Sequence, residues 1–197
     1  SFYLAGGPIV GGWALALQAQ GEEGIAQICQ GIAAYRATGA EVHLPHLLAL
    51  LAEAYGKTGQ AEEGLSTLSE ALTLVNRTGE RFYEAELYRL KGELTLQQAN
   101  QKAKGKRQKA KIPNPQHLTP STQSEAEACF LKAIAVAQRQ QAKSWELRAT
   151  TSLARLWQQQ GKQHEARIML SEIYNWFTEG FDTGDLQEAK ALLDKLT

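Results

Sequence analysis

The chain has 197 residues, of which 43% are hydrophobic, and this length and composition exclude a disordered chain and allow a sizeable core. Lysine plus arginine and aspartate plus glutamate both number 21, so no chain-wide charge attracts nucleic acid or an anionic membrane. The two cysteines, Cys29 and Cys129, lie a hundred residues apart, which predicts neither a disulfide framework nor a zinc site and favours a cytoplasmic location.

The first 21 residues, SFYLAGGPIVGGWALALQAQG, carry no charge. A signal peptide would begin with basic residues, and a membrane-spanning helix needs about 18 continuous apolar residues, whereas Pro8 and four glycines interrupt the apolar run here. The motif LAGGPIVGGW also lacks the Gly-Lys-Ser/Thr of a phosphate-binding loop. We therefore expect no membrane segment, and we interpret these glycines as small residues of a helix that packs closely on a neighbour.

A pattern of small, large and small residues, at steps of four and three, recurs along the rest of the chain. In AEEGLSTLSEALTLVNRTGE it consists of Gly64, Leu68 and Ala71. These steps keep the three side chains on one helical face, and the small residues let another helix approach. The other three copies are Gly24, Ile28, Gly31; Ala126, Phe130, Ala133; and Ala166, Leu170, Ile173.

Each copy follows a second apolar segment by about twelve residues and a short turn, as in LLALLAEAYGKTGQ and SLARLWQQQGKQ. This arrangement predicts helix pairs. The intervals between the first small residues are 40 (24 to 64), 62 (64 to 126) and 40 (126 to 166), so the third unit is 22 residues too long. The predicted units are 5–39, 41–79, 82–141 with an insert at 101–122, and 144–180, followed by a capping helix at 185–196.

The insert contains six cations and no acid. It has no aromatic residue on which bases could stack, and its PNPQHLTPST end is typical of flexible linkers. The first helix of the third unit can extend past Ala99 into the lysine-rich run, but Pro113 and Pro115 must end it. We interpret the insert as an exposed excursion; the alternative is that its cations contact an anionic partner. These cations are Lys102, Lys104, Lys106, Arg107, Lys109 and Lys111.

Both helices of the pairs resemble tetratricopeptide repeats (TPRs), although the period of 40 exceeds the usual length of about 34. The segments TGERFYEAELYRLKGELTL, SEAEACFLKAI, SWELRATTSLARLW and GFDTGDLQEAKALLDKL resemble the C-terminal repeat region of large bacterial signalling proteins, which contain an ATPase module and often a class III nucleotide cyclase. The resemblance implies an all-α, TPR-like α-solenoid of about four helix pairs plus a capping helix. It also implies a non-catalytic protein-interaction or sensor function within a longer protein.

The TPR groove positions, carried over onto this sequence, predict a partner-binding surface of mixed charge on the concave face. Such a surface suits a protein, a peptide or a neighbouring domain better than nucleic acid. The runner-up function is nucleic-acid binding or transcription regulation through the lysine-rich insert. The predicted groove residues are His46, Glu53, Lys57, Glu86, Arg89, Glu93, Arg148, Arg155 and Gln158.

No catalytic residue, cofactor site or metal site is predicted. His43 and His46 lie three residues apart, but no third ligand accompanies them in the sequence. Pairs of glutamates such as Glu62 and Glu63 recur at the start of predicted helices, where they favour the positive end of the helix dipole, so they indicate structure and not acid and base catalysis.

Overall fold

The computed structural model describes residues 2–18, 20–110 and 120–196. Within these ranges the chain is helical and contains no strand. The helices are α1 (Phe2–Leu17), α2 (Gly21–Ala37), α3 (Leu44–Lys57), α4 (Ala61–Thr78), α5 (Glu84–Ala110), α6 (Pro120–Arg139), α7 (Lys143–Gln159), α8 (Gln163–Tyr174) and α9 (Gly184–Leu193).

The repeated small, large, small pattern lies on the second helix of each pair, and all of its residues are buried. Where the small residue is glycine, the backbones of the paired helices touch. A Cβ atom on Gly24 would lie 2.4 Å from the carbonyl oxygen of Gly12, and one on Gly64 would lie 3.2 Å from that of Ala52. The pattern therefore marks close helix packing, as the sequence predicts.

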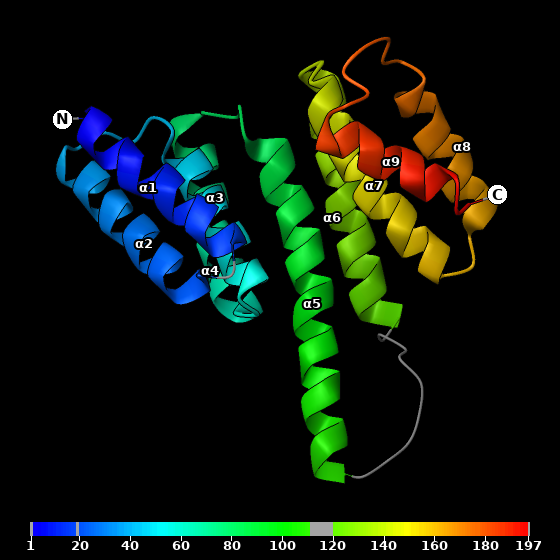
Figure 1. Ribbon diagram of the computed structural model, residues 1–197, viewed down its shortest axis with the longest axis horizontal. Coiled ribbons are helices and arrows are strands. Elements are labelled where there is room, and N and C mark those ends of the chain that lie inside the picture. The colour runs from blue at the N-terminus through cyan, green and yellow to red at the C-terminus, as the bar shows by residue number, and fades with distance from the viewer. Residues whose placement is uncertain (1, 19, 111–119, 197) are drawn as a thin grey trace.

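The helix pairs stack into an array, as Figure 1 shows. Within each pair α1 packs on α2, α3 on α4, α5 on α6, and α7 on α8. The first helices also pack on one another in succession, from α1 to α3, α5, α7 and finally α9. This places the first helices in one layer and the second helices in another, with α9 continuing the first layer, which is the arrangement of a helical solenoid.

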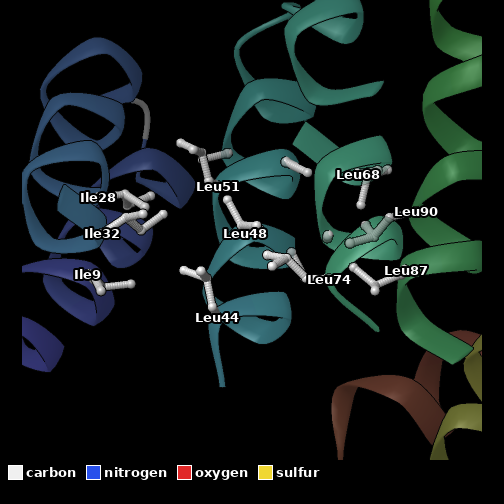
Figure 2. Close-up of a cluster of buried hydrophobic side chains, with 14 of the residues drawn as sticks. Ile9, Ile28, Ile32, Leu44, Leu48, Leu51, Leu68, Leu74, Leu87 and Leu90 are labelled. Carbon is white, nitrogen blue, oxygen red and sulfur yellow. The ribbon is translucent and has the colours of Figure 1, made fainter. Parts of the chain in front are cut away.

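The core runs between successive pairs. In Figure 2, apolar side chains of α1, α2, α3, α4 and α5 lie between these helices, with Leu48 of α3 among them. On the other side of α5, the Phe130 side chain is 1% exposed and packs with Leu153 and Leu156 of α7. The burial of Phe130 confirms that the large residue of the third copy of the pattern lies on a packing face, here between the third and fourth pairs.

The surplus segment of the third unit begins as helix. Helix α5 continues through the first part of the cationic run and ends at Ala110, before the prolines, and α6 begins at Pro120. In Figure 1, α5 reaches well beyond the ends of its neighbours. Lys102 and Lys104 are exposed on this extension. The side chains of Lys106, Arg107 and Lys109, and all of Lys111, lie outside the described residues.

Candidate functional site

A cavity of about 390 Å³ lies on the concave face, where α3, α5, α7 and α9 meet. Only these helices, all of which belong to the first-helix layer, contribute to its lining. Six of the nine predicted groove residues line the cavity, so the repeat register brings together side chains that lie up to a hundred positions apart. These six are Glu53, Lys57, Arg89, Glu93, Arg148 and Arg155.

A buried ion pair on α5 supports the wall of the cavity. Glu86 and Arg89 lie three residues apart on one helical face, and their side chains are 5% and 8% exposed. Arg89 donates two hydrogen bonds to the Glu86 carboxylate, from Nε at 2.8 Å and from Nη2 at 2.7 Å. This paired geometry is the strongest that the two groups can form.

Burial alone would raise the pKa of the Glu86 carboxyl, but the guanidinium groups of Arg89 and Arg148 outweigh it, and the pKa is lowered. Burial likewise acts to lower the pKa of Arg89, but the carboxylates of Glu86, Glu93 and Glu53 together outweigh it and raise the pKa. Both groups are therefore charged at neutral pH. Together they place a fixed, compensated charge pair beneath the concave face.

Hydrogen bonds extend this pair across to α7. Arg89 Nη1 lies 2.5 Å from Glu93 Oε1, and the Ser152 hydroxyl donates to the same oxygen at 2.8 Å. Arg148 Nη2 donates to Glu86 Oε1 at 2.8 Å. Since Glu86 and Glu93 belong to the third pair and Ser152 and Arg148 to the fourth, the network holds the two pairs together at the cavity.

Helix α9 completes the network with two acids. Arg148 Nη1 lies 3.3 Å from Asp185 Oδ1, and Arg155 forms an ion pair with Glu188. The predicted groove residues do not include these two acids. Their spacing of three residues places both on one side of α9, away from its buried residues Leu186, Ala189 and Leu192, and is the signal that could have found them.

Three predicted groove residues lie elsewhere. Glu86 sits beneath the cavity, and Gln158 lines neither this cavity nor its neighbour described next. His46 stacks on Tyr83, with ring centroids 4.2 Å apart, and Tyr83 in turn meets the edge of Trp145 at 5.0 Å. Burial, followed by the charge of Glu86, raises the pKa of Tyr83 to about 12, so its hydroxyl stays protonated.

A second cavity, of about 430 Å³, continues the first along α5 and α7. The two share Glu93, Gln97, Ser152 and Arg155, and we call them together the concave groove. Amide side chains are prominent in the second part, and the sequence prediction missed them because glutamine and asparagine are common on any exposed helix. The further residues of the second part are Leu96, Asn100, Gln101, Lys104, Phe130, Leu156 and Gln159.

In the part of the chain that the structure describes, no three His, Cys, Asp or Glu side chains come together as a metal site. No helix there has the length and hydrophobicity needed to span a membrane. His43 is the N-cap residue immediately before α3, and its backbone N–H donates to the Glu80 carboxylate at 2.8 Å, so His43 belongs to the start of that helix.

Comparison with known proteins places the fold. No family model and no curated protein matches the sequence. A crystal structure of nearly identical TPR-like repeats from Podosopora anserina, described as a putative kinesin light chain, aligns over 100% of this chain and 86% of its own, with a TM-score of 0.65 and 16% identity. A form of that protein with one substituted residue aligns over 96% of this chain and 83% of its own, with a TM-score of 0.64 and 16% identity.

This chain is a TPR-like all-α solenoid. The structural similarity to these TPR-like repeats covers all four helix pairs and α9, and it confirms the fold that the repeat pattern predicts. At 16% identity it concerns the fold alone.

Proposed function

We propose that this TPR-like chain is a non-catalytic interaction module that holds an extended peptide, or a segment of a neighbouring domain, in the concave groove. The observation that carries this proposal is a continuous groove lined by α3, α5, α7 and α9, with its walls fixed by hydrogen bonds between helix pairs. Because these side chains are already ordered, binding a partner costs little of their conformational entropy. The proposed function requires no cofactor.

The side chains that line the groove suit a peptide backbone. Asn100 and Gln159 are exposed, and each offers both a hydrogen-bond donor and an acceptor, as a peptide backbone requires. Leu90, Leu94 and Leu156 lie beneath these polar groups and are only 4%, 3% and 1% exposed. A partner strand in the groove would therefore meet mainly polar side chains, which can satisfy its backbone groups.

The charges of the groove favour a protein over a nucleic acid. Arg89, Arg148 and Arg155 each pair with a carboxylate. The acids of this network, Glu86, Glu93, Asp185 and Glu188, outnumber the three arginines. A phosphate backbone would meet these carboxylates at close range and would release few counterions. The exposed Lys102 and Lys104 on the extension of α5 are the one observation that favours nucleic-acid binding, which remains the second candidate function.

The wider setting also belongs to this proposal. The resemblance of the later repeats to bacterial signalling proteins supports a place for this chain, as one repeat domain of four units and a cap, within a larger cytoplasmic ATPase or cyclase protein. In that setting the groove would bind a partner protein or another domain, while catalysis would belong to the other domains.

A random dodecapeptide library displayed on phage tests the proposal. Selection would use the full chain and a variant in which Asn100→Trp and Gln159→Trp narrow the second part of the groove. The matched control is Asn76→Trp with Gln30→Trp, which places the same residues on the exposed surfaces of α4 and α2. We expect clones that bind the wild type and the control at least about tenfold better than the groove variant. Clones that bind all three proteins equally would overturn the proposal.

A further inference from the structure

We propose that the extension of α5 forms the cationic end of the concave groove, and that the peptide held there carries acidic residues over Lys104, while the nearby Lys102 adds to the positive charge of the extension. This inference rests on the proposed function and names the chemistry of its partner. It joins two features that the sequence presents as separate, the groove and the lysine-rich insert.

One face of α5 connects the two features. Glu93, Gln97, Asn100 and Lys104 follow one another at steps of four, three and four, which keeps them on one side of the helix, and all four line the second cavity. At 1.5 Å per residue the distance from Glu93 to Lys104 is about 16 Å, which an extended peptide covers with about five residues. A peptide in the groove therefore reaches Lys104 without a break.

Two hydrogen bonds fix this stretch of α5 against the rest of the array. The Gln97 amide donates from Nε2 to the Gly56 carbonyl at 2.7 Å, and that of Gln101 donates to the Gly59 carbonyl at 2.8 Å. Gly56 lies in the last turn of α3, and Gly59 lies between α3 and α4. The start of the extension is thus held beside the groove, and each glutamine keeps an amide oxygen that can accept from a peptide N–H.

The charge changes sign along this face. At the α9 end each arginine of the groove has a carboxylate partner, whereas no acid occurs in the sequence between Glu93 and Glu125. Among the described residues no carboxylate pairs with Lys102 or Lys104, and both side chains are exposed. The groove therefore has a balanced end and a cationic end, and the cationic end offers charges for a partner to neutralise.

An acidic peptide satisfies both ends better than a nucleic acid does. A nucleic acid that used Lys104 would pass its next phosphates along Glu93, where carboxylates line the groove. The sequence contains no aromatic residue between Tyr88 and Phe130, and Phe130 is buried, so the described part of the extension offers no platform for base stacking. A peptide can place carboxylates at the lysines and neutral residues elsewhere.

The same dodecapeptide library tests the inference. Among clones that depend on the groove, we expect aspartate and glutamate to be enriched at one end of the peptide. The enrichment should disappear when selection uses Lys102→Gln with Lys104→Gln. It should persist with Lys132→Gln and Arg139→Gln, which remove two exposed cations of α6 that line neither cavity.

Fluorescence anisotropy with the most enriched peptide then gives the magnitude. The Lys102 and Lys104 double variant should bind about five- to tenfold more weakly than wild type at low salt, and the difference should shrink as salt is added. A form of the peptide with glutamine in place of its acidic residues should bind wild type and variant equally. The affinity of a labelled single-stranded RNA of twelve nucleotides, measured in the same way for wild type and variant, is compared with that of the peptide.

The outcomes separate this inference from the proposed function. Groove-dependent peptides without acidic enrichment, or with equal affinity for the lysine variant, would overturn the inference and leave the function intact. RNA binding tighter than peptide binding, lost in the lysine variant, would overturn it in favour of a nucleic-acid partner. If no clone depends on the groove, both proposals fail.

Discussion

The contact between Phe130 and Gly92 allows a sharp test of the packing between helix pairs. A Cβ atom on Gly92 would lie 2.5 Å from Cε1 of the Phe130 ring and within 2.9 Å of two further ring atoms. The ring has little room to move because its surroundings include Leu153 and Leu156 of α7. Gly92→Ala should therefore destabilise the protein, although alanine is the better helix former.

The magnitude follows from two opposing effects. Forcing a methyl group into a packed core costs about 1 to 3 kcal/mol, while replacing glycine with alanine inside a helix gains about 1 kcal/mol. The net loss should be about 0 to 2 kcal/mol, near the upper end because the Phe130 ring has little room to move. Phe130→Ala alone should cost about 3 to 5 kcal/mol, because it removes a fully buried ring. In that background Gly92→Ala should reverse sign and stabilise the protein by about 1 kcal/mol, since the methyl group enters the vacated space.

Urea unfolding followed by circular dichroism measures the four free energies of this cycle. Gly7→Ala is the matched control, because Gly7 is exposed on α1 and a Cβ atom there would meet no atom within 4 Å. That control should be neutral or slightly stabilising. An equal effect of Gly92→Ala in both backgrounds would show that the ring does not rest on Gly92, and it would refute the repeat register that places Phe130.

Three further predictions concern the ion pair, the insert and nucleotide binding. Glu86→Gln should lower the free energy of unfolding by about 3 kcal/mol at pH 7, because buried Arg89 loses its carboxylate. The pKa of Glu86 is lower in the folded than in the unfolded protein, so the stabilisation by its carboxylate is complete above the unfolded pKa and is lost as the pH falls through the folded pKa. The difference in Tm between the variant and the wild type should therefore narrow on acidification. A constant difference would contradict the lowered pKa of Glu86. Replacing residues 102–119 with a short glycine-containing turn should keep the helical circular dichroism and leave Tm equal or higher. The reason is that the entropy cost of closing a loop grows only with the logarithm of its length. Collapse of the fold would show instead that this segment packs on the rest of the protein. Calorimetry with Mg-ATP should show no heat of binding to this chain, because Gly56, Lys57 and Thr58 end helix α3 and Leu51 stands where a Gly-x4-Gly-Lys-Ser/Thr phosphate-binding loop has its first glycine. Micromolar affinity would contradict the interaction function.

The fold could be predicted because helix packing leaves a periodic record in the sequence. Steps of four and three place Gly64, Leu68 and Ala71 on one face whatever lies opposite, so each copy of the pattern identifies a buried face independently of the others. The interval of 40 then aligns the copies and isolates the surplus of the third unit. The length of α5 was less predictable, since lysine, glutamine and alanine favour a helix equally well in a solvated extension and in a core element.

The groove was only partly predictable, because its contacts join helices that periodicity does not relate. The bond between Arg148 and Glu86 spans 62 positions, and nothing in either local sequence specifies the other partner. Analogy with TPR positions located six of the lining residues, since those follow from the register. It missed Gln97, Gln101 and Ser152, whose roles depend on the distance between particular side chains and the turn or helix opposite.

Helix α9 shows how closure of the solenoid and the chemistry of the groove depend on each other. Its buried face, which includes Leu186 and Ala189, packs in the last core cluster, while its other side brings Asp185 and Glu188 to Arg148 and Arg155. Without α9 both arginines would lose a carboxylate, and the balanced end of the groove would become cationic like the extension of α5. A groove whose cations outnumber its carboxylates at both ends would attract phosphate backbones more readily. The preference for a peptide therefore depends on the same helix that caps the core, so changes that loosen α9 should weaken selectivity before they unfold the array.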